Sequence, residues 1–349
     1  MTSSDPSTDK LVIAAPCADV LIAARDRADT IERAVQSALI QPEVAAVIVI
    51  DDGSTDDTSA RAVKCDPHGK RLIIERLNFS AGPSAARNVA IEISKSPWLA
   101  ILDGDDFILP GRIGRLLSFS ADWDFIADDP LQIAEDRIGH EAPTSMLSDA
   151  SREPRGIDLE EFVRGNIARR GALRRELGFV KPLIRRSFLD RHDLRYDEAL
   201  RLGEDYALYA RALASGARFR LVQAAGYVSV IRADSLSARH SKQDLERLRD
   251  SDGELMAITT LTLRERRALK AHHLSVDCRV QWLTVIEAYK SRHLMEFLTP
   301  FLRSPTIALY VITRLLEEFF RRAKQRLSAK SPIDYEVDTG PNGNKSGMN

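Results

Sequence analysis

The chain has 349 residues, of which 44% are hydrophobic, so it can bury one large core or two smaller ones. Its 50 Lys and Arg residues almost balance its 51 Asp and Glu residues, and the formal net charge of -1 provides no general field that would favour nucleic acid. The three cysteines (Cys17, Cys65 and Cys278) are widely spaced and form no CxxC pair, which argues against a zinc site or a disulfide framework and favours a reducing compartment.

The N-terminal segment is polar at first and lacks the basic start of a signal peptide. The apolar stretch Leu11–Ala24 is interrupted by Pro16 and Asp19, so it is typical neither of a secretory signal nor of a membrane span. We therefore expect a cytoplasmic protein, with residues 1–17 as a flexible N-terminus and residues 332–349 as a disordered tail.

Aliphatic runs of strand length alternate with helical patterns through the first third of the chain. The run Val44–Ile50 is almost continuously apolar, as expected for a parallel strand that is covered on both faces. Asp29-Thr30-Ile31-Glu32 is a D-x-x-E capping box that predicts a helix start, and Gly82-Pro83-Ser84 predicts another. This alternation predicts a doubly wound, mostly parallel sheet. Its expected strands are Val20–Ala24, Val44–Ile50, Leu72–Ile74 and Trp98–Leu102, and its expected helices begin near Ile31, Thr58 and Pro83.

The pattern changes beyond about residue 122. One further strand is expected at Asp124–Ala127, and one or two at Phe219–Ile231. Asp158–Val163 and Glu204–Leu213 have the spacing of short amphipathic helices. Beyond Ser241 the sequence is charged and helical in pattern, which predicts a helical C-terminal extension.

Two of the expected strands end in carboxylates. Trp98–Leu102 runs into Asp103-Gly104-Asp105-Asp106, and Val44–Ile50 runs into Asp51-Asp52. Because the carboxyl ends of parallel strands share one edge of a sheet, where open α/β folds bind ligands, these carboxylates are expected to lie together. A hard divalent cation that shares its ligand shell with substrate phosphates would balance their charge. The pattern predicts a metal-dependent site for a nucleotide diphosphate, although an ordinary acidic turn would give the same residues.

Two helix starts add candidate groups. Gly82-Pro83-Ser84 offers free backbone N–H groups that suit an anion, and Arg87, one turn later, could reach a phosphate or stabilise a carboxylate. The alternative for this segment is tight helix packing with a solvent-facing arginine. Glu204 and Asp205 either cap a helix or place a general base at the site.

Five motifs follow one another along the chain: Asp19–Leu39, Val47–Asp56, Gly82–Asn88, Leu102–Asp106 and Gly203–Asp205. Together they resemble the large family of inverting glycosyltransferases that use nucleotide sugars and have the GT-A fold, glycosyltransferase family 2. The resemblance covers about residues 19–240. It implies an α/β fold with a mostly parallel central sheet, related to the Rossmann type.

The resemblance implies a role for each matching residue. Asp52 would hold the nucleotide base, Asp103 the ribose and the metal, and Asp105 the metal, which would be Mn²⁺ or Mg²⁺. Asp205 would be the general base, with Glu204 orienting the loop or an acceptor hydroxyl. The next candidates for the base are Asp128 and Asp129.

The chain departs from the family at its first strand. Ala23-Ala24-Arg25-Asp26 stands where the family usually has Pro or Ser, any residue, Tyr and Asn. The change removes an aromatic surface near the base, and Asp26 is expected to keep a polar contact with the nucleotide. The predicted nucleotide-binding residues are Ala23, Arg25, Asp26, Asp52, Arg87 and Asp103.

A later segment, Ser235-Leu236-Ser237 with His240, resembles one that closes over the donor in relatives. His240 is therefore a candidate to touch the metal or the pyrophosphate, and the alternative is a structural or solvated loop histidine. The Gln-x-x-Arg-Trp motif of processive family members is missing after Asp205. A transferase that adds one sugar is thus favoured over a polymer synthase.

The segment Thr306–Leu327 has an apolar stripe at helical spacing, flanked by five basic residues. A helix packed on the domain explains the stripe, and so does a basic amphipathic helix that binds anionic lipid. The second explanation suits a lipid-linked acceptor and predicts peripheral contact with the inner face of the plasma membrane.

These observations predict a metal-dependent, inverting hexosyltransferase. We expect glucose from UDP-glucose to be added in β linkage to a lipid-diphosphate-linked oligosaccharide, as in bacterial exopolysaccharide glucosyltransferases of the succinoglycan type. A nucleotidylyltransferase is an alternative, but its glycine-rich basic signature is missing from Ala23–Arg27. A non-catalytic nucleotide-sugar-binding module is another, and it would not need Asp205. The expected domains are 18–240, with a nucleotide-sugar half (18–121) and an acceptor half (122–240), and a helical extension (241–331).

Overall fold

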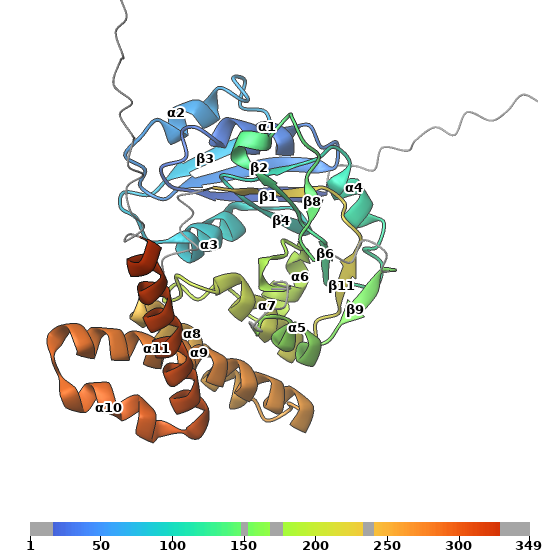
Figure 1. Cartoon of the computed structure of the whole chain (residues 1–349). Coiled ribbons are helices and arrows are strands. Elements are labelled where there is room, and N and C mark those ends of the chain that lie inside the picture. Colours follow the sequence, from blue (N-terminus) through green and yellow to red (C-terminus); the bar gives the residue numbers. More distant parts are fainter. Residues whose placement is uncertain (1–16, 148–152, 168–176, 233–240, 329–349) are drawn as a thin grey trace, which may run out of the picture. The chain divides into compact units, whose positions relative to one another are not determined.

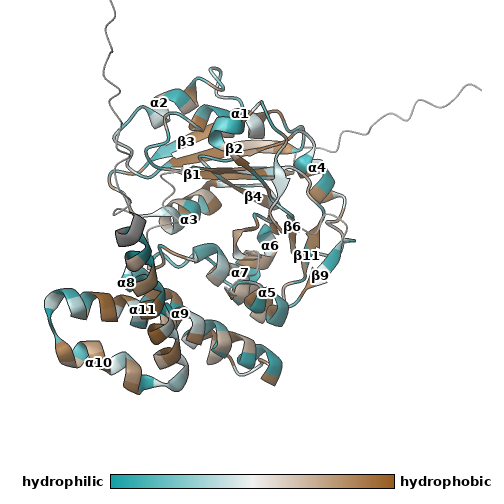
Figure 2. Ribbon diagram, in the orientation of Figure 1, coloured by the Kyte–Doolittle hydropathy of each residue, from teal (hydrophilic) through white to brown (hydrophobic). Residues whose placement is uncertain are grey.

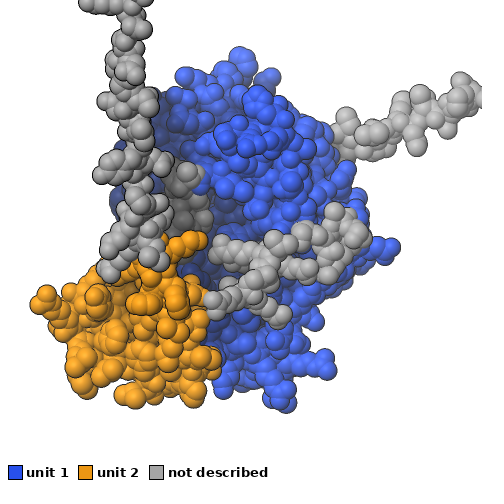
Figure 3. Space-filling view, viewed as in Figure 1, with its two compact units in different colours: residues 1–280 blue, residues 281–349 orange. Residues whose placement is uncertain are grey.

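The computed structural model describes residues 17–147, 153–167, 177–232 and 241–328 (Figure 1). The chain divides into two compact units, residues 1–280 and 281–349, which Figure 3 colours separately. The boundary between the units falls within a helix, whereas the sequence placed a domain boundary after residue 240. The functional domains expected from the sequence stay predictions.

The first unit is built on a central sheet, whose eight strands in the described residues run in the order β3-β2-β1-β4-β10-β6-β11-β9. The strands β3, β2, β1 and β4 are parallel neighbours, as the sequence predicted. The short strand β10 lies antiparallel between β4 and β6, and β9 is antiparallel to β11 at one edge. The bounds are β1 Ala18–Ala24, β2 Val44–Asp51, β3 Leu72–Arg76, β4 Trp98–Asp103, β6 Phe125–Asp128, β9 Arg155–Ile157, β10 Leu183–Arg185 and β11 Phe219–Val222.

Helices cover both faces of this sheet (Figures 1 and 2). Val20 and Ile22 of β1 lie in one buried core with Ile31 of α1, and the period of two along a strand turns Leu21 to the opposite face. Figure 2 shows the strands as the most hydrophobic layer of this unit. The helices are α1 Ile31–Leu39 and α2 Thr58–Val63 on one face, α3 Pro83–Ile93 and α7 Glu204–Ala214 on the other, and the shorter α4 Arg112–Leu117, α5 Leu159–Gly165 and α6 Arg186–Arg191.

Aromatic side chains form the core between the central sheet and the helices α6 and α7. Phe125 of β6 packs edge-on against Phe188 of α6 and Tyr209 of α7, with ring centroids 6.0 and 5.9 Å away. Such contacts add to the stabilisation from area burial alone. They hold α7, which begins with Glu204 and Asp205, against the sheet.

The predicted capping box at Asp29 is wrong. The N-cap of α1 is Thr30, and no side chain caps the helix. The Thr30 hydroxyl instead donates to the carbonyl of Gly104, 2.8 Å away, and Asp29 is exposed. A hydrogen bond between distant segments thus replaces the expected hydrogen bonds of the capping box. It connects the start of α1 to the acidic loop after β4.

The predicted strand region Phe219–Ile231 forms two strands in different sheets. β11 lies between β6 and β9 in the central sheet, whereas β12 (Tyr227–Ile231) belongs to a small sheet of order β5-β12-β7-β8 in the described residues. Gly226, with φ of +124°, turns the chain between them. The other strands of the small sheet are β5 Phe107–Ile108, β7 Leu131–Ala134 and β8 Thr144–Ser145, and two short 3₁₀ turns occur at Glu135–Arg137 and Leu177–Phe179.

The C-terminal part is helical, as predicted. α8 (Lys242–Met256) opens with a capping box between Ser241 and Asp244 and packs on α7. α9 (Leu263–Ser291) crosses the boundary between the units, and α10 (Leu294–Arg303) and α11 (Pro305–Ser328) pack against each other in the second unit. Among the described helices, none is long and apolar enough to span a membrane.

Candidate active site

The carboxyl ends of three neighbouring strands bring the predicted residues together. In the strand register Ala23 pairs with Asp103 and Ala24 pairs with Asp51. Gly104 permits the close approach that follows, since a Cβ there would lie 3.2 Å from the Cβ of Ala24. The expected convergence of the acidic strand ends is therefore present in the fold.

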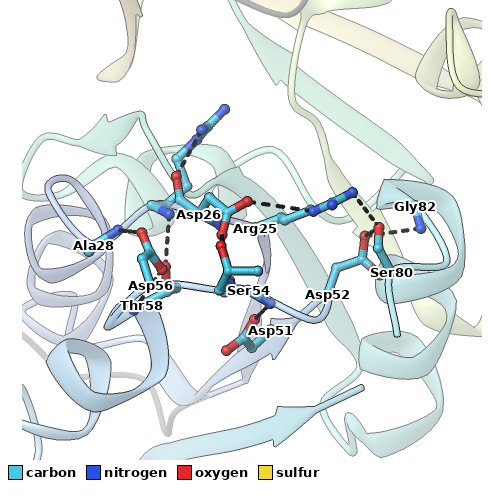
Figure 4. A network of polar contacts seen from close by, with 12 residues as sticks. Arg25, Asp26, Ala28, Asp51, Asp52, Ser54, Asp56, Thr58, Ser80 and Gly82 are labelled. Atoms are coloured by element: carbon cyan, nitrogen blue, oxygen red, sulfur yellow. Dashed lines mark hydrogen bonds and ion pairs between the residues drawn. The ribbon is translucent and has the colours of Figure 1, made fainter. Parts of the chain in front are cut away.

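Asp52 is held by the loop that precedes α3 (Figure 4). Its carboxylate accepts hydrogen bonds from the hydroxyl of Ser80 at 2.8 Å and from the N–H groups of Ala81 and Gly82 at 2.6 and 3.0 Å. Gly82 has φ of +99°, a conformation that favours glycine, and the next residue begins α3. The neighbouring Asp51 is fully buried and accepts from the N–H of Ser54 at 2.7 Å, so it stabilises the turn.

The end of β1 lies beside this loop. Nη1 of Arg25 donates to the Ser80 hydroxyl at 2.8 Å, and the Arg25 side chain is 52% exposed. Asp26 has φ of +50° and accepts from the N–H of Thr55 at 2.8 Å. The structure thus brings Ala23, Arg25, Asp26 and Asp52 to one rim (Figure 4).

A buried ionic cluster joins the acidic strand end to the start of α7. Nη2 of Arg87 lies 2.8 Å from Oδ1 of Asp103, and its Nη1 lies 2.8 Å from Oε1 of Glu204 and 3.6 Å from Oδ1 of Asp205. Nζ of Lys181 lies 2.8 Å from Oδ2 of Asp103 and 2.6 Å from Oδ2 of Asp205. The Arg87 side chain is only 5% exposed, so a solvent-facing arginine is wrong, and its contacts are with carboxylates.

The cluster keeps Asp103 and Lys181 in their charged forms. Burial alone would raise the pKa of Asp103, but Lys181 and Arg87 outweigh it and hold that pKa well below its usual range. Burial would likewise lower the pKa of Lys181, yet Asp103 and Asp205 raise it above its usual value. Burial with the nearby carboxylate of Asp205 raises the pKa of the Tyr196 phenol, whose hydroxyl donates to Oδ1 of Asp205 at 3.0 Å.

Among the described residues Asp105 has one cation within ion-pair distance, whereas Asp103 has two. Oδ2 of Asp105 lies 3.3 Å from Nε of Arg27, and the Asp105 carbonyl accepts from Nη2 of Arg33 at 2.9 Å. Burial and the nearby charge of Asp103 raise the pKa of Asp105. A carboxylate in that state gains from an added cation.

Asp106, the third acidic residue of the motif, faces the protein interior. It accepts from the hydroxyl of Tyr227 at 2.6 Å and from the N–H of Val230 at 2.9 Å. Burial, with Asp103 and Asp105 nearby, raises the pKa of Asp106 to about 7. Asp106 therefore links the loop after β4 to β12, and it does not join Asp103 and Asp105 as a third carboxylate of the candidate site.

Asp103 and Asp105 are the described residues that would hold a divalent cation, although both oxygens of Asp103 are paired with Arg87 and Lys181. The described residues contain no cage of three or more His, Cys, Asp or Glu side chains. Ions such as Mg²⁺ often take only one or two protein carboxylates and complete their shell with substrate phosphates and water. His240, the third predicted ligand, lies outside the described residues.

Asp128, one of the two fallback candidates for the general base, has its carboxylate occupied within the fold, whereas Asp129 stays a candidate. Asp128 is fully buried, and its Oδ1 lies 2.7 Å from Nη2 of Arg112. Its Oδ2 accepts from three consecutive N–H groups, those of Ala225, Gly226 and Tyr227. Asp129 is buried as Asp205 is, and it likewise has one donor on each oxygen, the hydroxyl of Ser145 and the N–H of Leu147.

Sequence reasoning missed Lys181 and the support behind α7. The one local signal for Lys181 is a lone lysine within the apolar stretch Phe179–Ile184. Behind α7, the hydroxyl of Tyr206 donates to Asp252 at 2.8 Å, and Nδ1 of His272 lies 2.7 Å from the same carboxylate. These contacts fix the residue next to Asp205, and no sequence motif announces them.

The strand order of the central sheet is that of the GT-A fold, and solved structures agree. S. aureus TarS (residues 1–349) in complex with UDP-GlcNAc superposes with a TM-score of 0.56, at 16% identity, over 80% of this chain and 89% of that one. The mannosyltransferase PcManGT from Pyrobaculum calidifontis, in complex with GDP-Man and Mn²⁺, gives 0.54 at 14% identity over 88% of both chains. The predicted fold class is confirmed.

The chain belongs to glycosyl transferase family 2, whose model matches residues 19–167. It is 48% identical over 284 residues to succinoglycan biosynthesis protein ExoU from Rhizobium meliloti, which covers 79% of this chain and 78% of ExoU. Succinoglycan biosynthesis protein ExoO of the same organism is 30% identical over 353 aligned positions, or 97% of both chains. This chain is also similar to the Escherichia coli UDP-Glc:alpha-D-GlcNAc-diphosphoundecaprenol beta-1,3-glucosyltransferase WfaP. The two are 37% identical over 101 residues, which make up 29% of this chain and 39% of WfaP.

Asp128→Asn should destabilise the fold, because the variant leaves the Arg112 guanidinium buried without its full counter-charge. Breaking a buried ion pair in this way costs about 3–5 kcal/mol. Urea unfolding of the full chain measures the loss. The exposed Asp122, which lies 3.8 Å from Arg218, is the matched control, and Asp122→Asn should change stability by less than about 1 kcal/mol. A folded Asp128→Asn protein of normal stability and no turnover would restore Asp128 as a candidate base.

Proposed function

We propose that this glycosyltransferase adds one sugar, glucose from UDP-glucose, in β linkage to a lipid-diphosphate-linked oligosaccharide during exopolysaccharide biosynthesis of the succinoglycan type. The observation that carries the proposal is the cluster in which Lys181 and Arg87 join Asp103, at the donor edge, to Asp205 and Glu204. The names of ExoU and ExoO support the pathway, and that of WfaP supports a β-linked glucose and a lipid-linked acceptor.

Asp205 is the proposed general base. Its carboxylate takes the proton of the acceptor hydroxyl as that oxygen bonds to C1 of the sugar, and the bond from C1 to the UDP oxygen breaks on the opposite face. Attack from that face inverts an α-linked donor to a β-glycoside. Glu204 is held by Arg87 and orients the loop or an acceptor hydroxyl.

The donor is assigned to the rim at the ends of β1 and β2. Asp52 would accept from the nucleotide base, with Arg25, Asp26 and the main chain at Ala23 beside it, and Asp103 would hold the ribose. A Mn²⁺ or Mg²⁺ ion bound by Asp103 and Asp105 would neutralise charge on the departing diphosphate. Arg87 would support the donor site indirectly, because its guanidinium holds the Asp103 carboxylate in place.

Radiolabelled UDP-glucose with Mn²⁺ tests the activity, with and without a membrane fraction as the acceptor source. The proposal is supported if label is transferred to a lipid-extractable product and EDTA abolishes that transfer. Equal activity with and without EDTA would rule out the metal dependence. A nucleotidylyltransferase would instead release inorganic diphosphate from a nucleoside triphosphate and a sugar phosphate. A binding module would bind UDP-glucose without turnover.

Asp52→Ala should weaken donor binding by about 1.5–3 kcal/mol, the range for a hydrogen bond that involves a charged group. Calorimetric titration of UDP into the full chain measures this change. Asp56→Asn is the matched control, since Asp56 belongs to the same polar network but bonds to Ala28 and Thr58 (Figure 4). An unchanged Kd in a folded Asp52→Ala protein would remove Asp52 from the donor site.

Asp205→Asn should lower kcat by about 10²–10⁴, because the amide keeps the size of the side chain but does not accept the proton. Donor affinity should barely change. Glu204→Gln should cost less and act partly on the acceptor KM. The two variants form a matched pair at adjacent positions, and the reverse ranking of their kcat values would exchange the two roles.

Peripheral membrane contact through Thr306–Leu327 is part of the proposal. In α11 the side chains of Leu309, Ile312, Leu316, Phe319 and Phe320 are exposed. Glu318 pairs with Arg321 and Arg322, so part of the basic charge is neutralised and apolar burial would carry much of the binding. The exposed basic side chains along α11 would favour binding to anionic lipid headgroups.

Phe319→Gln with Phe320→Gln should reduce binding to phosphatidylglycerol vesicles by at least about tenfold, since burying each phenyl ring contributes about 1.5–3 kcal/mol. Vesicle sedimentation of the full chain measures this, and the exposed Gln325→Ala variant should bind as the wild type does. Aggregation or lost stability of the double variant would favour the other explanation, a helix that packs on protein.

A further inference from the structure

Lys181 lies outside every motif of the chain, two residues before β10 begins, and its side chain is 7% exposed. We propose that Lys181 is a positioning residue that holds the general base Asp205 in a fixed orientation relative to the donor-side carboxylate of Asp103. This inference rests on the proposed function, in which Asp205 accepts the acceptor proton.

The contacts of Asp205 carry the inference. Its Oδ2 lies 2.6 Å from Nζ of Lys181, and its Oδ1 accepts the hydroxyl of Tyr196 at 3.0 Å. With one donor on each oxygen, the carboxylate has a single orientation, and each oxygen keeps a further lone pair. Glu204 is paired with Arg87 instead, so Lys181 distinguishes between the two adjacent acidic residues.

The main chain of Lys181 is fixed independently of its ammonium group. Nη2 of the buried Arg112 donates to the Lys181 carbonyl at 2.6 Å, and the same guanidinium is paired with Asp128. Pro182 follows, and Leu183 then enters β10 between β4 and β6. The backbone is therefore anchored to the sheet, and the side chain alone spans from it to Asp103 and Asp205.

A lysine suits this place because its ammonium is a compact charge with three donors, of which two meet Asp103 and Asp205. Without it, Arg87 would be the remaining cation within ion-pair distance of Asp205 among the described residues, at 3.6 Å. Asp103 keeps its closer Arg87 contact of 2.8 Å. Loss of Lys181 should therefore affect the base more than the donor-side carboxylate.

The test measures UDP release from UDP-glucose by the full chain, with water as the acceptor. Lys181→Ala should lower kcat by about 10- to 100-fold, as expected for loss of a charged hydrogen bond, and change the donor KM by less than about threefold. Propylammonium, which replaces the deleted side-chain atoms, should restore part of kcat, and Lys181→Arg should retain more activity than Lys181→Ala. In an Asp205→Asn background, Lys181→Ala should have little further effect.

The matched control is Arg186→Met. Arg186 lies five residues further along the chain and donates to the carbonyls of Ile91, Ser94 and Ser96, so its loss should lower stability without amine rescue. The inference is overturned if Lys181→Ala behaves like this control, or if its effect is the same with Asp205 present and absent.

Failure of the proposed function has a separate signature. A wild-type chain that releases no UDP with water or with the membrane fraction removes UDP-glucose as the donor. The contact is then tested by urea unfolding of the wild type, Lys181→Ala, Asp205→Asn and the double variant. Coupled changes in stability support the Lys181–Asp205 contact, and additive changes overturn it.

Discussion

The structure depends on one electrostatic constraint, the pairing of two buried cations with one buried and two partly exposed carboxylates. Asp103 comes from the end of β4, Glu204 and Asp205 from the start of α7, Arg87 from α3 and Lys181 from the segment before β10. A buried charge is very unfavourable unless it is paired and hydrogen-bonded, so Arg87, Lys181 and Asp205 are buried where their partners converge. The same convergence places the acidic edge of the sheet beside the start of the helix that carries the proposed base.

The parts of the fold that sequence predicts well are those whose signal is local. The continuous aliphatic run of β2 and the proline at the first turn of α3 define their elements without help from the rest of the chain. The three-residue strand β10 is too short for any periodicity, and its place between β4 and β6 is a tertiary fact. The capping box at Asp29 failed for the same reason, since Thr30 found a partner in Gly104 on another segment.

The site follows the same division. The edge carboxylates could be predicted because the carboxyl ends of parallel strands must meet there. Sequence left Arg87 undecided between a phosphate, a carboxylate and solvent, because its partner Glu204 lies 117 positions away. Lys181 was missed altogether, since a single lysine in a loop has no pattern, and its role arises only from the two carboxylates that it faces.

Aspartates that look alike in sequence are separated by the number of donors around them. Asp128 receives Arg112 and three main-chain N–H groups and is fully buried, so its hydrogen-bonding capacity is spent within the fold. Asp105 has one longer ion pair, to Arg27, and a side chain that is 28% exposed. Asp205 has one donor on each oxygen and retains lone pairs. Asp105 and Asp205 are therefore where the fold leaves carboxylate oxygens available to a cation or an acceptor hydroxyl, whereas Asp128 stabilises the sheet that supports them.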